Sequence, residues 1–228
     1  MKILAPSPAA ISEAVEALKQ GALVAFPTET VYGLGASAVD ANALKRLYAA
    51  KGRPAEHPVI VHLSDTDQLS EWVSHIPPAA MRLAQSLWPG PMTLILPRSV
   101  RAQDAVTGGQ NSVGVRIPNH PVALELLKSF GDGVAAPSAN KFGQLSPTNA
   151  TDVASEFRDE LAIVLDGGPC DVGIESTIID FSQEQPRILR PGMILPEQIE
   201  LIAGIKLQAG LWASSKTEST RVPGGLPS

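Results

Sequence analysis

Apolar residues recur at helical spacing near the start of the chain. Ile11, Val15 and Leu18 lie three or four positions apart, so they share one face of a helix. Ser7 is a typical N-cap residue, and Pro8 suits the first helical position because an amide hydrogen is not needed there. The pattern predicts a helix that begins at Pro8.

Similar signals predict the other elements. Helices are expected after the capping residue Asp40 and at 77–88, 120–130, 151–157 and 196–202. Short apolar runs predict strands at 22–26, 58–63, 92–96, 112–117, 134–136, 162–165, 177–181 and 187–189. Strands and helices alternate, which favours the α/β class. The 20 prolines, many of them beside strands, indicate edge or antiparallel strands in a mixed sheet.

Apolar residues alternate in the predicted strand 112–117. Val113, Val115 and Ile117 share one face, and Arg116 lies on the other, so we expect one preferred buried face. A guanidinium among apolar neighbours needs an anionic partner. That partner is either a structural carboxylate or a substrate carboxylate.

The 228 residues suit one large domain with a short appendage. Hydrophobic residues make up 44% and charged residues 18%, so a sizeable buried core is expected. From about residue 210 the chain becomes polar and then rich in Gly and Pro, as in linkers. We predict a main domain at 1–205 and a linker or flexible tail at 206–228.

Charge and cysteine content exclude several classes of protein. Lys and Arg number 18 against 23 Asp and Glu, and the net charge of −5 argues against a dedicated nucleic-acid binder. Cys170 is the single cysteine, which excludes an intrachain disulfide and a multi-cysteine zinc site. Residues 1–10 lack the layout of a signal peptide, and no apolar run approaches the ~20 residues of a membrane span. We therefore expect a cytoplasmic protein with no membrane contact.

Polar loops follow several predicted elements. Segment 27–35 (PTETVYGLG) comes after an apolar strand, where α/β proteins often bind ligands, so it is either a ligand loop or a strand-to-helix turn stabilised by its own side chains. Lys51 and Arg53 of KGRP either converge on a phosphate or stabilise the dipole of the preceding helix. Ser138 and Asn140 suit either ligand contacts or simple turn chemistry.

The histidines give a weak metal signal. His57 and His62 have no further ligands at suitable spacing, so we predict no metal-binding residues. His62 lies in an apolar strand, where a histidine is more often a satisfied core residue than a ligand. The chain also has no nucleophile elbow, Walker phosphate loop, dinucleotide fingerprint or kinase motif set, so ATP would need an unusual site.

Eight motifs follow one another along the chain: PTETVYGLG (27–35), KGRP (51–54), PVIVH (58–62), WPGPMTLIL (88–96), SVGVRIP (112–118), APSAN (136–140), STIID (176–180) and RPG (190–192). In this order they resemble the YrdC/Sua family of threonylcarbamoyl-AMP synthases, and the resemblance extends to about Gly192. It implies an open, twisted mixed α/β sheet, the YrdC-like fold, with a positively lined cavity. Residues 1–205 would then be the catalytic domain.

The resemblance implies an ATP-dependent nucleotidyltransferase. Threonine and bicarbonate form a carbamate, whose carboxylate attacks the α-phosphate of ATP to give threonylcarbamoyl-AMP and pyrophosphate. Mg²⁺ accompanies ATP as the cofactor. Downstream threonylcarbamoyl-transferase proteins then modify an adenosine of tRNA, with which this chain would make at most a weak contact.

The same resemblance assigns the site. The catalytic pocket residues are Lys51, Arg53, Ser138 and Asn140. ATP is expected to contact Arg53, His57, Ser112, Ser138, Ser146 and Arg190. Threonine is expected to contact Thr30, His62, Arg116, the Ala136 backbone and Ser176. We expect Lys51→Ala and Arg116→Ala to remove activity with little loss of folding.

Two departures from the family pattern concern His57 and the tail. The family often has Asn where His57 stands, and a histidine there can still donate or accept a hydrogen bond. Longer members continue through a linker that contains His and Tyr into a second domain, and we expect residues 206–228 to be the start of that linker. On this reading the chain would lack part of a lid over its active site.

Two other readings stay open. One is a double-stranded RNA-binding module, which the net charge disfavours. The other is a carbamoyltransferase-related domain like those of hydrogenase maturation proteins. Such domains usually accompany acylphosphatase-like and zinc-finger segments, which do not occur in this sequence.

Overall fold

The computed structural model describes residues 1–54, 56–208 and 221. In this part of the chain, ten strands form a sheet in the order β1-β8-β2-β3-β7-β4-β6-β5-β9-β10. The strands are β1 (Lys2–Leu4), β2 (Val24–Phe26), β3 (Gly33–Ser37), β4 (Ile60–His62), β5 (Met92–Pro97), β6 (Ser112–Arg116), β7 (Val134–Ala135), β8 (Ile163–Leu165), β9 (Thr177–Asp180) and β10 (Arg187–Arg190). The helices are α1 (Pro8–Lys19), α2 (Ala41–Lys51), α3 (Leu69–Trp72), α4 (Pro78–Leu87), α5 (Asp104–Thr107), α6 (Pro121–Phe130), α7 (Ala150–Phe157), the 3₁₀ turn η1 (Arg158–Glu160) and α8 (Pro196–Ala203).

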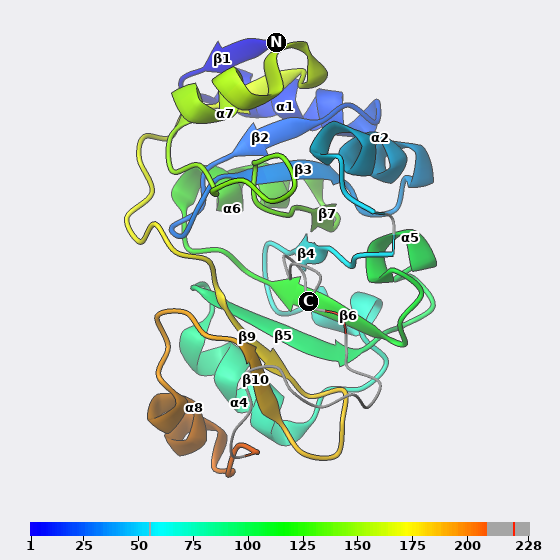
Figure 1. The fold of residues 1–228 in the computed structure, drawn as a ribbon, viewed down its shortest axis with the longest axis vertical. Helices are drawn as coiled ribbons and strands as arrows, with labels where there is room; N and C mark the ends of the chain where they lie inside the picture. Colours follow the sequence, from blue (N-terminus) through cyan, green and yellow to red (C-terminus); the bar gives the residue numbers. More distant parts are fainter. Residues whose placement is uncertain (55, 209–220, 222–228) are drawn as a thin grey trace.

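The sheet is mixed, as the prolines indicated. Strand pairs β1–β8, β2–β8, β4–β6 and β5–β9 are parallel, and the remaining pairs are antiparallel. Figure 1 shows the sheet running from β1, near α1 and α7, to β9 and β10, near α4 and α8. The predicted α/β class and open mixed sheet are confirmed.

Side-chain caps start several of the predicted helices. The Ser7 Oγ accepts a hydrogen bond from the Ala10 amide, and Asp40 Oδ1 accepts from Asn42 and Ala43. His120 caps α6 in the same way through Nδ1. These bonds satisfy amides that have no partner inside the helix, which is why the predicted and observed helix starts agree within a residue or two.

The sequence allows two interpretations of the segment after β2, a ligand loop or a strand-to-helix turn. Residues 27–32 connect β2 to β3, which pair as antiparallel neighbours, so the second of these, the strand-to-helix turn, is wrong. Glycine makes this close pairing possible, because a Cβ on Gly35 would lie 2.9 Å from the Phe26 ring and 3.0 Å from the Val24 carbonyl. Strand β3 consists mostly of small residues, which show no alternation of apolar and polar positions. The sequence pattern therefore predicts no strand there.

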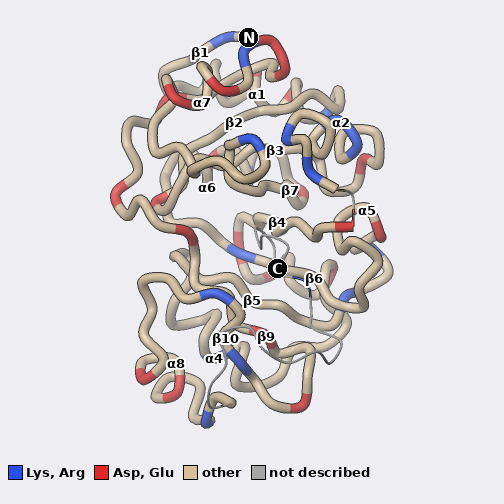
Figure 2. Tube along the Cα trace, viewed as in Figure 1, with Lys and Arg blue, Asp and Glu red and all other residues tan. Residues whose placement is uncertain are grey.

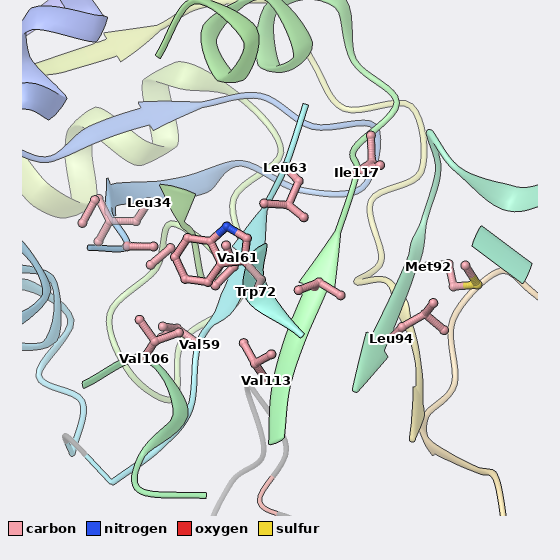
Figure 3. Close-up of a cluster of buried hydrophobic side chains, with 14 of the residues drawn as sticks. Leu34, Val59, Val61, Leu63, Trp72, Met92, Leu94, Val106, Val113 and Ile117 are labelled. Atoms are coloured by element: carbon pink, nitrogen blue, oxygen red, sulfur yellow. The ribbon is translucent and has the colours of Figure 1, made fainter. Parts of the chain in front are cut away.

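Alternate residues of the strands pack against helices on opposite faces of the sheet. Val24 and Phe26 of β2 join a buried cluster with α1 and α6. Ala25, between them, joins the larger cluster that includes residues of α2, α4, α7 and α8. Figure 3 shows part of this larger cluster, with Trp72 beside Val61. Each fully buried large apolar side chain stabilises the fold by roughly 1.5–3 kcal/mol relative to an exposed one.

Strand β6 is buried on both faces, so the expectation of one preferred buried face is wrong. Val113 and Val115 belong to the larger apolar cluster, as the alternation predicted. Gly114 on the opposite face lies against Ile60 and Ile95, and Arg116 is 4% exposed. A charged residue at such a position requires a partner, which the site provides.

Most of the predicted linker at 206–228 lies outside the described residues, and its role stays a prediction. Arg221, which is described, bonds to Gln110 and to the Gly108 carbonyl at the end of α5. Within the described chain, no helix has both the length and the apolar character that crossing a membrane requires.

Candidate functional site

A cavity opens where segments from both halves of the sheet meet. Its walls come from the β2–β3 connection, the loop after α2, strands β4 and β6, the turn after β7, and the segments around β9 and β10. The lining residues are Thr28, Thr30, Val31, Tyr32, Gly33, Arg53, Ile60, His62, Arg116, Ala136, Pro137, Ser138, Glu175, Ser176 and Arg190. Eight of the residues predicted from the sequence are among them.

The register of the central strands explains why these side chains meet. His62 of β4 is the pairing partner of Arg116 on the parallel strand β6, so the two side chains lie on the same face. On that face α1 and α6 pack over β2, β7 and β8. The part of the face that carries Ile60, His62 and Arg116 lines the cavity instead.

Arg116 forms a buried ion pair with Glu29. Its Nη2 lies 2.8 Å from Glu29 Oε1 and donates to Thr30 Oγ1 at 3.0 Å, while Nε donates to the Gly90 carbonyl at 3.3 Å. No described residue accepts a hydrogen bond from Arg116 Nη1. Of the two partners left open by the sequence, the structural carboxylate is therefore present, and one guanidinium nitrogen is left for a ligand.

Arg190 closes the opposite side of the cavity. Its Nε donates to the Ser176 carbonyl and its Nη2 to Ser176 Oγ, both at 3.0 Å, and its Nη1 pairs with the Glu175 carboxylate. Ser146 Oγ donates to the same carboxylate at 3.1 Å. Burial lowers the pKa of Arg190, and the charge of Glu175 opposes that shift.

Lys51 and Arg53 leave the end of α2 on either side of Gly52, whose φ of 62° ends the helix in the left-handed region. Lys51 Nζ donates to the Ser138 carbonyl at 2.6 Å and the Asn140 carbonyl at 2.5 Å, and not to the last carbonyls of its own helix. Burial, followed by the nearby charge of Arg53, lowers the pKa of Lys51 to about 7. The alternative interpretation, that Lys51 and Arg53 only stabilise the dipole of the preceding helix, therefore does not by itself explain the position of Lys51.

Arg53 lines the cavity directly. Its Nη2 donates to the Pro58 carbonyl at 2.8 Å, which fixes the guanidinium, and its buried Nε has no partner among the described residues. Burial lowers the pKa of Arg53 from its ordinary value, but a guanidinium stays charged at neutral pH. The Arg53 guanidinium is thus a positioned cation that can donate further hydrogen bonds.

The Ser138–Asn140 turn is held by hydrogen bonds of its own side chains. Ser138 Oγ donates to Asn140 Oδ1 at 2.6 Å, and Asn140 Nδ2 donates to the Lys141 and Gln144 carbonyls, both at 2.8 Å. Ser138 lines the cavity, whereas Asn140 supports the turn from behind and receives Lys51 on its carbonyl. Asn140 thus fits the turn interpretation, and a ligand contact of Ser138 stays a prediction.

His62 is a neutral imidazole in the cavity wall. It is 3% exposed, its ring meets the Phe26 ring edge to face at 6.1 Å, and burial lowers its pKa to about 3. Its Nδ1 has no hydrogen-bond partner among the described residues. His62 lines the cavity, and its contact with a ligand stays a prediction.

Other predicted ATP residues lie outside the lining. His57 packs its ring against Phe142, with ring centroids 5.6 Å apart. Ser146 reaches the cavity only through Glu175. Ser112 lies four residues before Arg116 on β6, about 13 Å along the strand. The roles of His57 and Ser112 stay predictions.

Sequence reasoning missed the carboxylates of the site. Glu29 stands inside the motif PTETVYGLG and Glu175 directly before STIID, and the motifs assign neither of them a role. The available signal was electrostatic, because four cations gathered in a partly buried hollow need counter-charges when no ligand is bound. Tyr32 was also missed; its hydroxyl donates to the Gly168 carbonyl at 2.8 Å, and burial raises its pKa.

The described residues form no group of three or more His, Cys, Asp and Glu side chains suited to a metal ion. A metal held at this cavity would therefore rest mainly on ligand oxygens. Mg²⁺ fits that arrangement, because it commonly binds one carboxylate together with substrate phosphates and water.

Comparisons with known proteins agree on one family. A family model for Sua5/YciO/YrdC, described as telomere recombination, matches residues 16–192. The threonylcarbamoyl-AMP synthase of Pyrococcus abyssi is 45% identical over 208 residues, and that of Bacillus subtilis is 44% identical over 216 residues. These alignments cover 91% and 94% of this chain but only 61% and 62% of the relatives' own length.

Solved structures give the same answer. The P. abyssi Sua5 structure complexed with L-threonine matches with a TM-score of 0.87 and 41% identity, covering 97% of this chain and 67% of that one. Escherichia coli YciO shares the fold, with a TM-score of 0.78 at 22% identity over 87% of this chain and 98% of its own. The chain belongs to the Sua5/YciO/YrdC family.

Proposed function

We propose that this chain is an enzyme that condenses L-threonine, bicarbonate and ATP into threonylcarbamoyl-AMP and pyrophosphate. The relatives from P. abyssi and B. subtilis carry the corresponding name, and P. abyssi Sua5 has been solved with L-threonine. The observation that carries the proposal is that Arg53, Arg116 and Arg190 line one cavity, with Lys51 behind its wall. A polyphosphate and an amino-acid carboxylate need such a set of cations together.

Threonine fits the side of the cavity formed by β4 and β6. Arg116 is held by Glu29 and Thr30 and offers its remaining nitrogen to the threonine carboxylate. Neutral His62 and the Thr30 hydroxyl can exchange hydrogen bonds with the substrate amine and hydroxyl without adding charge. The Ala136 backbone and Ser176 complete this side of the site.

The nucleotide fits the side formed by Arg53, Ser138 and Arg190, with Lys51 and Ser146 just behind. Catalysis then depends on position and charge: the carbamate carboxylate is held against the α-phosphorus, and the cations stabilise the negative charge that moves to the leaving pyrophosphate. Mg²⁺ bound with ATP would neutralise part of the same charge. A covalent intermediate with the protein is not required.

The product is an activated mixed anhydride, so a second protein must accept the threonylcarbamoyl group. In this proposal that acceptor is a threonylcarbamoyl-transferase acting on an adenosine of tRNA, in the cytoplasm. Direct RNA binding is a weaker candidate role. In Figure 2, positions of Lys and Arg are interspersed with positions of Asp and Glu along the chain, which does not favour a surface for RNA. Glu29 and Glu175 also lie at or beside the cavity.

The test is pyrophosphate release from ATP in the presence and absence of each co-substrate. Release that requires threonine and bicarbonate together supports the proposal. Equal release without threonine contradicts it. Tight RNA binding that falls steeply with salt, without ATP turnover, would favour the RNA-binding reading.

A further inference from the structure

Glu175 is the only carboxylate among the described residues that line the cavity. It stands directly before β9, beside Ser176, and its side chain is 30% exposed. Glu29, an acidic residue behind the cavity wall, is 8% exposed at its side chain, pairs with Arg116 and accepts from the Asn119 amide. Glu29 is thus fixed in a structural role, whereas Glu175 faces the space where a ligand enters.

The contacts of Glu175 are the same groups that the proposed nucleotide site requires. Its Oε1 accepts from Ser146 Oγ, and its Oε2 pairs with Arg190 Nη1. Both residues are assigned to ATP under the proposed function. A nucleotide that engages them must share them with the carboxylate or displace it.

A carboxylate inside a polyphosphate site is unfavourable, because like charges a few ångströms apart repel. A divalent cation between them reverses the sign of that interaction. Mg²⁺ suits this position, since it accepts one carboxylate oxygen together with phosphate oxygens and water. Glu175, the one carboxylate among the described lining residues, therefore fits a site that assembles only when nucleotide and metal enter together.

We infer that Glu175 is the protein ligand for the divalent cation that accompanies the nucleotide, an inference that rests on the proposed function. In the free protein the carboxylate neutralises Arg190 and accepts from Ser146. When nucleotide and metal bind, it exchanges at least one of these partners for the metal. Glu175 thereby couples metal binding to nucleotide binding.

The test measures ATP binding by calorimetry without threonine, once with Mg²⁺ and once with EDTA, for the unaltered protein and for Glu175→Gln. Removing the negative charge should tighten metal-free ATP binding by roughly tenfold. The same change should reduce the gain in ATP affinity on adding Mg²⁺ by a similar factor. Mn²⁺ binding to the ATP complex, followed by electron paramagnetic resonance, should weaken in parallel.

Glu160→Gln is the matched control, because Glu160 pairs with Lys141 at 2.6 Å but does not line the cavity. It should bind ATP like the unaltered protein in both conditions. Glu175→Asp, which keeps the charge, should retain a gain in affinity on adding Mg²⁺ and tests the inference even where Gln impairs folding.

A Glu175→Gln protein that loses affinity equally with and without Mg²⁺ would overturn the inference and assign Glu175 to positioning Arg190. An unchanged Mg²⁺ gain in Glu175→Gln would overturn it as well, while leaving the proposed function intact. If the unaltered protein binds no ATP in either condition, the proposed function fails together with the inference.

Discussion

Glu29 Oε1 and Arg116 Nη2 lie 2.8 Å apart in an ion pair whose side chains are 8% and 5% exposed. The pair connects the β2–β3 connection to the end of β6, and Glu29 Oε2 extends the link to the Asn119 amide. Arg116 is consequently part of the fold and part of the cavity wall at once. Its substitution should affect stability as well as binding.

We predict that Arg116→Ala lowers the free energy of unfolding by about 3–5 kcal/mol, because it leaves the Glu29 carboxylate buried without its partner. This replaces the expectation that Arg116→Ala would leave folding nearly intact. The double variant Arg116→Ala/Glu29→Gln should recover part of the loss. Urea denaturation of both single variants and the double variant measures the coupling. Strictly additive losses would show that the pair contributes nothing as a pair.

Lys51 should exchange a proton when an anion binds near neutral pH. Its pKa is lowered to about 7 by burial and by Arg53, while Glu175 and Glu156 act in the opposite direction. A bound polyphosphate raises the pKa again, so ATP binding at pH 8 should take up a proton. Calorimetry in two buffers of different ionisation enthalpy measures this uptake. Lys51→Met should abolish it, and equal uptake by both proteins would rule out Lys51 as its source.

The same shift has a consequence for stability. Between pH 7 and 10.5 the unfolded chain holds a proton on Lys51 that the folded protein has released. The free energy of unfolding should therefore rise with pH across this window. In Lys51→Met the rise should be smaller, which denaturation at pH 7 and pH 10 can detect. An identical rise in both proteins would contradict the near-neutral pKa.

His62 should make the protein sensitive to acid. Its folded pKa is about 3 against an ordinary value of 6.5, so below pH 6.5 the unfolded chain binds a proton that the folded protein does not. Stability should fall as the pH drops from 6.5 towards 3, by at most about 1.4 kcal/mol per pH unit from this group. His62→Gln should reduce that slope. An unchanged slope in His62→Gln would contradict the lowered pKa of His62.

Much of the fold could be predicted because local physics determines it. Helix α1 follows from Ser7, Pro8 and the spacing of its apolar residues, and the observed bounds agree. Strand β3 could not be predicted, since its Gly and Ala residues carry no periodic signal and are buried only through their neighbours. Strand β1 has only three residues, Lys2–Leu4, and forms by pairing with the distant β8, so no local pattern predicts it.

Part of the site could likewise be predicted from the sequence, and part could not. Arg53, Arg116 and Arg190 could be assigned from motifs, and the structure brings them to one cavity. The pairing of Arg190 with Glu175, 15 residues away, depends on how β9 and β10 meet, which no local pattern encodes. The sequence therefore indicated the cations but not the carboxylates that hold them in the absence of a ligand.

The most direct measurement is a crystal structure of this chain with L-threonine and an ATP analogue whose α,β-bridge cannot be cleaved. We predict the threonine carboxylate within hydrogen-bond distance of Arg116, and phosphate oxygens within the same distance of Arg53 and Arg190. If either ligand binds outside the cavity and contacts none of these three guanidinium groups, the shared site for nucleotide and amino acid is contradicted.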